Sequence, residues 1–147
     1  MNVYKNILVA VDGSKGAETA FDRAVAVALR NEASLMLAHV IESSLNIPRE
    51  YSGGLRTQSI EKSEAWADQL LNNFKIKAIE RGVKDVRTKI AMGTPKVEII
   101  KGIAPFNSTD LIICGATGTN ALQRIFIGSV SEYISRNASC DVLIVRE

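Results

Sequence analysis

The residues of this chain best suited to chemistry form a glycine- and serine-rich run in its last third. The run begins with Gly115-Ala116-Thr117-Gly118 and, after nine residues, ends with Gly128-Ser129-Val130-Ser131. Glycine has no Cβ, so its main chain can approach an oxyanion closely, and free amides at a helix N-terminus attract anions. The hydroxyls of Ser129 and Ser131 are further donors. The run predicts a phosphate site without a lysine, and the chain contains neither a GxxxxGK[ST] loop nor a GxGxxG fingerprint.

A second interpretation of the same run involves no ligand. Gly115 and Gly118 can serve simply to shape a turn, and Ser129 with Glu132 matches the S-x-x-E capping box, which satisfies helix amides internally. The two interpretations compete, because a Glu132 carboxylate folded over the cap would lie where a phosphate has to bind. Nucleotide binding would therefore require Glu132 to point outward.

The elements that must position this run alternate between strand and helix. Continuous apolar runs are typical of strands buried on both faces, and they occur at 7–11, 35–41, 111–114 and 142–145. Residues 86–91 alternate in polarity and predict a more exposed strand. Apolar residues at helical spacing predict helices over 17–28, 67–78, 95–104 and 130–137. Ser14 is the expected cap of the first helix, and Thr94-Pro95 begins the third.

This alternation predicts an α/β fold: a single domain over residues 1–147 with a doubly wound, five-stranded parallel sheet and four helices on its two faces. Such sheets bind ligands at the carboxyl ends of their strands, in the crevice at the switch point. In this chain the strand ends are Asp12-Gly13, Val40-Ile41, Met92-Gly93 and Gly115. The glycine run therefore starts at the edge where a ligand is expected.

Composition and charge argue against several classes of protein. A formal charge of +2 without a basic stripe is not typical of nucleic-acid binding. We find no leader pattern and no apolar run near the roughly 20 residues that cross a bilayer, so we expect a cytoplasmic protein without a membrane segment. Cys114 and Cys140 lack metal-ligand spacing, and small buried apolar residues are the expected role for both.

Other candidate residues admit a structural role. Asp12 is a candidate ligand for a ribose or a metal-bound water, although Asp-Gly-Ser after a strand is also an ordinary turn and cap. His39, the single histidine, lies inside an apolar strand and is expected to be a hydrogen-bonded structural imidazole. Trp66 is expected to pack beside the second helix, and the segment 42–57 to form either a flap or a disordered connection.

The spacing G-x2-G-x9-G-S, with Val11-Asp12-Gly13-Ser14 at the end of the first strand, resembles the ATP-binding universal stress protein family. Supporting segments are Leu37-Ala38-His39-Val40, Met92-Gly93-Thr94-Pro95 and Val142-Leu143-Ile144-Val145-Arg146. The likeness covers nearly the whole chain. Asp141 departs from the pattern, because family members often carry proline after the cysteine.

The resemblance implies a Rossmann-like sheet that holds ATP, with Mg²⁺ or Mn²⁺ bound through the phosphates. It implies that Ala10 and Val11 line the nucleoside pocket, that Asp12 faces the ribose and that the main chain of Val40 meets adenine. The residues implied for the phosphate side are Gly115, Gly118, Gly128, Ser129, Val130 and Ser131.

The resemblance also implies a homodimer through the last strand and a regulatory role in a stress response, exerted through an unidentified protein partner. Enzymatic turnover is not expected beyond slow ATP hydrolysis, because the sequence offers no group to activate water. The alternative function is a structural or interaction dimer module of the same fold that binds no nucleotide.

Overall fold

The computed structural model describes residues 3–42, 49–116 and 128–146. Its strands are β1 (Asn6–Ala10), β2 (Ser34–Glu42), β3 (Val86–Gly93), β4 (Leu111–Gly115) and β5 (Asp141–Val145). Its helices are α1 (Lys15–Asn31), α2 (Arg49–Glu80), α3 (Pro95–Val97) and α4 (Ser129–Asn137), with a π-helical segment η1 (Glu98–Ile103) and a 3₁₀ turn η2 (Pro105–Asn107) after α3. Each predicted strand is confirmed with small differences at its ends. The expectation that the strand at 142–145 is buried on both faces is wrong, because Val142, Leu143 and Ile144 are only half-buried in β5.

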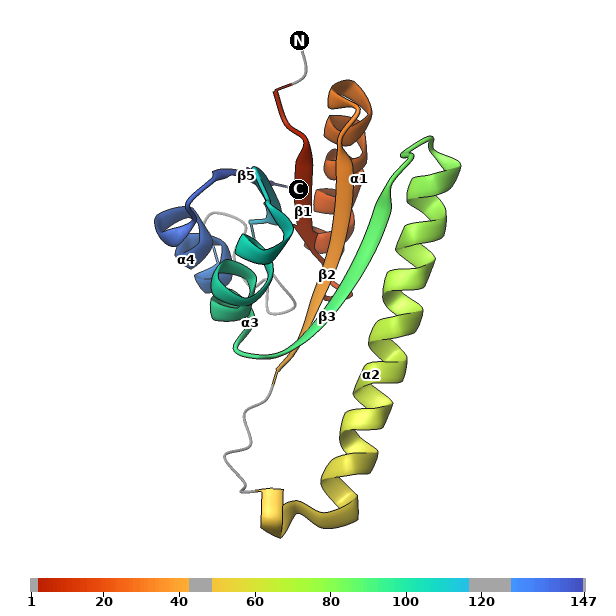
Figure 1. Ribbon diagram of the computed structural model, residues 1–147, viewed down its shortest axis with the longest axis vertical. Coiled ribbons are helices and arrows are strands. Elements are labelled where there is room, and N and C mark those ends of the chain that lie inside the picture. Colours follow the sequence, from red (N-terminus) through yellow and green to blue (C-terminus); the bar gives the residue numbers. More distant parts are fainter. Residues whose placement is uncertain (1–2, 43–48, 117–127, 147) are drawn as a thin grey trace.

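The strands form one parallel sheet in the order β3-β2-β1-β4-β5. The chain runs outward from β1 to β3 and then returns to β4 on the other side of β1, which places the switch point between β1 and β4. Helices α1 and α2 lie on one face, and α3, η1 and α4 lie on the other (Figure 1). The doubly wound α/β fold predicted from the sequence is confirmed.

Each face of the sheet has its own apolar core, and β1 contributes to both. Ile7 and Val9 pack toward α1 and α2, whereas Leu8 packs toward η1 and α4. Successive residues of a strand point to opposite faces, so a strand covered on both sides needs apolar residues throughout. The Phe21 and Phe74 rings, 4.6 Å apart at their centroids, join α1 to α2 in the first core.

β3 is an edge strand, as its mixed polarity predicts. It pairs with β2 from Val86, opposite Leu35, to Gly93, opposite Glu42. The segment 87–89, which contains an arginine and a lysine, is exposed. Charged side chains on an edge discourage pairing with another chain, whereas β5, at the opposite edge, carries the apolar sequence Val142-Leu143-Ile144.

The second helix is longer than predicted. Residues 49–57 belong to α2, so the prediction of a flap or disordered connection over 42–57 is wrong for that part, while residues 43–48 lie outside the described residues. Gly53 and Gly54 weaken the helical pattern, since each glycine costs about 1 kcal/mol in a helix interior, but they do not stop a helix that is packed further along. Figure 1 shows α2 extending beyond the end of the sheet.

The third helix is confirmed at its start and differs along its length. Thr94 is the N-cap residue and Pro95 follows it, although no side-chain hydrogen bond forms at the cap. After α3 the main-chain hydrogen bonds change to the π-helical pattern, in which an N–H donates to the carbonyl five residues before it. The Ala104 N–H, for example, donates to the Ile99 carbonyl at 3.0 Å. Pro105 has no N–H to continue the ladder, so the helical stretch ends in the short turn η2.

None of the helices in the described part of the chain is both long and apolar enough to cross a membrane.

Candidate nucleotide site

The end of β1 forms a tight turn into α1. Gly13 has a left-handed φ of 82°, which residues with a Cβ rarely adopt. The Ser14 N–H donates to the Asp12 carboxylate at 2.9 Å, and the Ala17 N–H donates to the Ser14 hydroxyl oxygen at 3.1 Å. The predicted cap at Ser14 is confirmed, and so is the turn role of Asp12. Because Asp12 remains exposed, this turn bond is compatible with a ligand contact.

The main chain of Val11 is held by β2. Its N–H donates to the Ala38 carbonyl at 2.8 Å, and its carbonyl oxygen lies 2.7 Å from Nδ1 of His39. Since a carbonyl can only accept, Nδ1 of His39 carries the proton. The expected structural imidazole is confirmed. The Val11 side chain is buried toward α1, whereas Ala10 is half-buried on the opposite face.

Val40 presents its main chain beyond the end of β1. Ala38 uses its carbonyl to bind Val11, and residues two apart in a strand direct their main-chain groups toward the same neighbouring strand. β1 ends at Ala10, opposite Ala38. The N–H and C=O of Val40 therefore point toward the space that β1 has left, which is the geometry that main-chain recognition of a base requires.

β4 ends against the first turn of α1. A Cβ on Gly115 would lie 2.8 Å from the Gly16 carbonyl oxygen, so the two main chains approach too closely for any residue but glycine. The Ala116 N–H donates to the Val145 carbonyl at 2.9 Å and fixes the exit of β4 to the end of β5. Gly115 thereby brings the N-terminus of α1 beside the predicted phosphate run.

The N-terminus of α4 is tied to the same strand end. The Gly128 N–H donates to the Ala116 carbonyl at 2.6 Å. The buried Ser131 hydroxyl lies 3.0 Å from the Ala116 carbonyl oxygen and 3.1 Å from that of Gly128. The Ser131 hydroxyl thus joins the two ends of the run within the protein, and the main-chain N–H of Ser131 takes no part in these two contacts.

The capping box of the ligand-free interpretation does not form. Gly128, not Ser129, is the N-cap residue, and no side chain of the described residues caps α4 by a hydrogen bond. With the N-cap at Gly128, the third helical position is Ser131, so Glu132 is one residue too late for the box. Its carboxylate instead pairs with Arg136, one turn further along, at 3.0 Å.

The first amides of α4 lie outside the helical hydrogen-bond ladder. The first bond of the ladder joins the Glu132 N–H to the Gly128 carbonyl at 3.0 Å, so the N–H groups of Ser129, Val130 and Ser131 precede it. The side chains of Ser129 and Val130 are exposed. The N-termini of α1 and α4 flank the end of β4. The first turn of α1 is capped by Ser14, whereas the first three amides of α4 and its dipole favour a bound anion.

The predicted site residues that the structure describes gather at the carboxyl edge of the sheet. They come from the end of β1 (10–12), from Val40 in β2, from Gly115 in β4 and from the start of α4 (128–131). Gly118 and the spacer 119–127 lie outside the described residues. The sequence did not predict that Gly16 contacts this edge, because the contact is with Gly115, which is distant in sequence.

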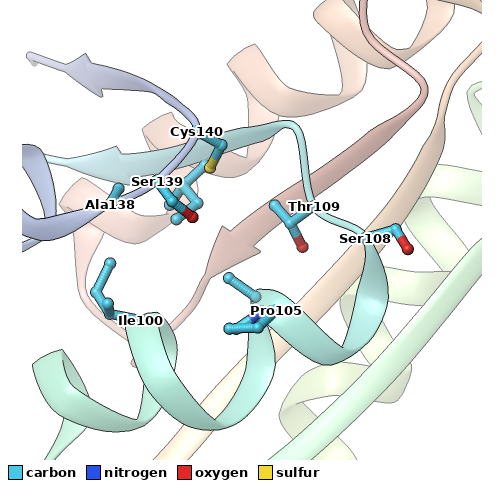
Figure 2. A pocket seen from close by; sticks show the side chains of 9 residues that line it. Ile100, Pro105, Ser108, Thr109, Ala138, Ser139 and Cys140 are labelled. Carbon is cyan, nitrogen blue, oxygen red and sulfur yellow. The ribbon is translucent and has the colours of Figure 1, made fainter.

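A hollow of about 220 Å³ lies at the opposite, amino end of β4 and β5 (Figure 2). Its walls come from η1, η2 and the segments that lead into the two strands. All its lining residues are uncharged, so it offers no charge to bind a phosphate. They are Ile100, Ala104, Pro105, Ser108, Thr109, Ile112, Ala138, Ser139 and Cys140.

The two cysteines are free thiols. Burial raises the pKa of the Cys114 thiol to about 11. Burial, followed by the charge of Asp141, raises the pKa of Cys140 as well. Both thiols are therefore protonated at neutral pH, which makes them poor nucleophiles and poor metal ligands. Within the described residues, no group of three or more His, Cys, Asp or Glu side chains is arranged to hold a metal.

The fold and this edge define a class of protein: a doubly wound α/β domain with a helix N-terminus at its switch point. The model of the universal stress protein family matches residues 3–146 of the chain. The chain therefore belongs to the universal stress protein family, which confirms the family that its sequence resembles.

Relatives and solved structures are similar over the whole domain. A universal stress protein homologue of Staphylococcus aureus (strain USA300) is 50% identical over 148 residues, which cover 99% of this chain and 86% of that protein. The universal stress protein UspA from Lactobacillus plantarum superposes with a TM-score of 0.88 at 31% identity and covers 97% of this chain and 98% of its own. A universal stress protein in complex with cAMP superposes with a TM-score of 0.73 at 25% identity and covers 97% of both chains.

Proposed function

We propose that this chain binds an adenine nucleotide at the carboxyl edge of its sheet and acts as a regulatory protein whose nucleotide state a protein partner reads. The observation that carries the proposal is the set of amides at Ser129, Val130 and Ser131, which precede the helical ladder of α4 beside the end of β4. The similar protein bound to cAMP supports an adenine ligand.

In this proposal the nucleotide lies across the switch point. The main chain of Val40 faces adenine, Asp12 faces the ribose, and Ala10 and Val11 line the nucleoside side. The phosphates lie on the α4 N-terminus, from Gly128 to Ser131, and against Gly115 and Gly118. The ligand is ATP, which brings Mg²⁺ or Mn²⁺ on its phosphates.

The proposed role is binding rather than turnover. Phosphoryl transfer to water needs a group that orients or activates the water in addition to contacts on the phosphates. Nδ1 of His39, the chain's single imidazole, is occupied by the Val11 carbonyl. We therefore propose a nucleotide-binding switch whose ATP hydrolysis is slow at most. We place this switch in the cytoplasm as part of the same proposal.

The edge strand β5 supports a homodimer in the same proposal. Val142, Leu143 and Ile144 are half-buried in a strand whose outer side has no neighbouring strand within residues 3–42, 49–116 and 128–146. Unpaired apolar edges favour pairing with another chain. Sedimentation equilibrium of the purified chain at micromolar concentration is expected to give twice the monomer mass, and a monomer would contradict this part of the proposal.

Ser129→Pro tests the phosphate site with little change to the fold. Ser129 is the first helical residue, where proline is well tolerated, and Gly128 has the extended backbone (φ −66°, ψ 163°) that a following proline requires. The variant removes one N–H from the proposed site. Losing a hydrogen bond to a charged group costs about 1.5–3 kcal/mol, so we expect the Kd of ATP–Mg²⁺ in calorimetry to rise about tenfold or more.

Ser129→Ala is the matched control, since it removes the hydroxyl and keeps the N–H. Its Kd is expected to rise only a few-fold, with both variants unfolding at the same urea concentration as the unmodified chain. Gly118→Val, which would occupy phosphate space, is expected to abolish binding without unfolding the domain. Equal affinity in Ser129→Pro and the unmodified chain would refute the site.

A ligand-free interaction module is the second candidate, and two contacts favour it. Gly115 is already required by its approach to Gly16, and the Ser131 hydroxyl is already used on main-chain carbonyls. If purified protein releases no nucleotide on denaturation and gives no heat with added ATP–Mg²⁺ in the micromolar range, this candidate replaces nucleotide binding.

A further inference from the structure

Trp66 places an aromatic ring of α2 against the turn that ends β1. Two atoms of the indole, Cζ2 and Cη2, lie 3.2 Å from the position that a Cβ on Gly13 would occupy. Trp66 lies within α2 rather than beside it, and the buried side chains that follow, Ala67, Leu71 and Phe74, pack in the core between α2 and the sheet. Helix α2 packs on β2 and β3, and the Trp66 indole adds a contact between α2 and the turn after β1.

His39 holds the same indole from the side of the sheet. The two rings are 5.2 Å apart at their centroids and meet edge to face at 65°. The imidazole also donates its Nδ1–H to the Val11 carbonyl at 2.7 Å. Trp66 therefore lies directly against Gly13, the residue after Asp12. Through His39 it is also linked to Val11, the residue before Asp12.

Burial alone does not account for Trp66. The residue is 49% exposed, whereas the adjacent Ala67 is fully buried. A tryptophan that leaves half its surface in water contributes much less to the core than a buried one. Its close contacts with Gly13 and His39 instead make it a brace for the turn that carries Asp12.

We infer that Trp66 is a positioning residue of the nucleotide site. By bracing Gly13 directly, and Val11 through His39, it keeps the exposed Asp12 carboxylate where the proposed ribose lies. It also links the occupancy of the site to α2, the helix that extends beyond the sheet (Figure 1). This inference rests on the proposed function, so its test must separate the two.

The test follows ATP–Mg²⁺ binding by calorimetry and by indole fluorescence in parallel. Trp66 is the chain's single tryptophan, so the indole emission of the unmodified protein comes from this residue alone. We expect the emission to change with the Kd that calorimetry gives. Trp66→Ala is expected to raise the Kd about tenfold, and Trp66→Phe, which restores an aromatic ring, to recover most of the affinity.

Ile76→Ala is the matched control. Ile76 is an apolar residue of the same helix, 47% exposed, and lies further along α2, so this variant is expected to bind with unchanged Kd. Heat of binding without an emission change, or an unchanged Kd in folded Trp66→Ala, overturns the inference and leaves nucleotide binding intact. An absence of heat in the unmodified chain rejects the proposed function and the inference together. If circular dichroism shows that Trp66→Ala has lost its fold, the test is the indole emission of the unmodified chain on ATP–Mg²⁺ binding. A change in that emission supports the inference, and heat of binding without such a change overturns it.

Discussion

The two ends of the parallel sheet treat their main-chain amides in opposite ways. At the amino end, the Asp110 carboxylate accepts from the N–H groups of Lys5 and Asn6 at 2.8 and 3.0 Å, and the Asn31 side chain accepts from the next two amides upstream. At the carboxyl end, no side-chain hydrogen bond caps α4 in the part of the chain that the structure describes. At the amino end carboxylate and amide side chains accept from four successive main-chain N–H groups, whereas at the carboxyl end the Asp12 carboxylate accepts only from Ser14 and no described side chain accepts from the first amides of α4.

The same difference extends to the side chains around each end. At the amino end the Tyr4 hydroxyl donates to Asp141 at 2.7 Å, a hydrogen bond that raises the pKa of Tyr4. The nearby hollow is lined by uncharged residues (Figure 2). At the carboxyl end the nearest acid on α4, Glu132, is paired with Arg136. Two of the acids near the carboxyl end thus already have a partner in the described residues: Asp12 accepts from the Ser14 N–H, and Glu132 pairs with Arg136.

The largest expected effect on stability comes from adding a Cβ at Gly115, at the carboxyl end of the sheet. Gly115→Ala would place a Cβ against the main chain of Gly16, which cannot move without displacing α1. Overpacking of this kind costs about 1–3 kcal/mol, and we expect the upper part of that range in urea unfolding, with a lower nucleotide affinity. Gly102→Ala is the control, since its Cβ would meet only the flexible Glu98 carboxylate. A larger loss in Gly102→Ala would contradict this explanation of Gly115.

An intermediate effect is expected from opening the amino end. Asp110→Ala removes the acceptor of two main-chain hydrogen bonds, and we expect a loss of about 1–2 kcal/mol in the free energy of unfolding. Asp110→Asn keeps one acceptor oxygen and is expected to lose less. Because Asp110 lies at the opposite end from the site, both variants should bind ATP–Mg²⁺ with unchanged Kd. A change in Kd would show that the two ends are not independent.

The smallest effect is expected at Glu132. Glu132→Gln breaks an exposed ion pair with Arg136, and such i,i+4 pairs contribute about 0.3–0.5 kcal/mol. We expect a stability change within that range and an equal or slightly lower Kd for ATP–Mg²⁺, because a negative charge leaves the first turn of α4. A tenfold rise in Kd would mean that the Glu132 carboxylate takes part in the site.

The sequence predicted the strands well because their polarity follows from how they are covered. A strand covered on both faces has a continuous apolar run, and an exposed edge strand has mixed polarity. The apolar run at 7–11 and the mixed run at 86–91 indicate a central and an edge strand without knowledge of any partner. The start of α2 could not be predicted, since residues around Gly53 and Gly54 show no apolar periodicity. The cap of α4 was misplaced by one residue because serine is usually the better N-cap, whereas here the bond from Gly128 to Ala116 decides where the helix begins.

By itself, the sequence determined the α/β class and the family, because periodicity and spacing along the chain are local properties. For the same reason it predicted the run from Gly115 to Ser131 as the phosphate side. The tertiary structure decided that Gly115 meets Gly16, that Glu132 turns away from the α4 N-terminus and that Trp66 braces the turn at Gly13. The contacts of Gly115 and Trp66 join segments that are distant in sequence, and they exist only once α1 and α2 have packed onto the sheet. Spacing along the chain can predict an anion site, but packing between distant segments determines which main-chain amides lie outside the protein's own hydrogen bonds.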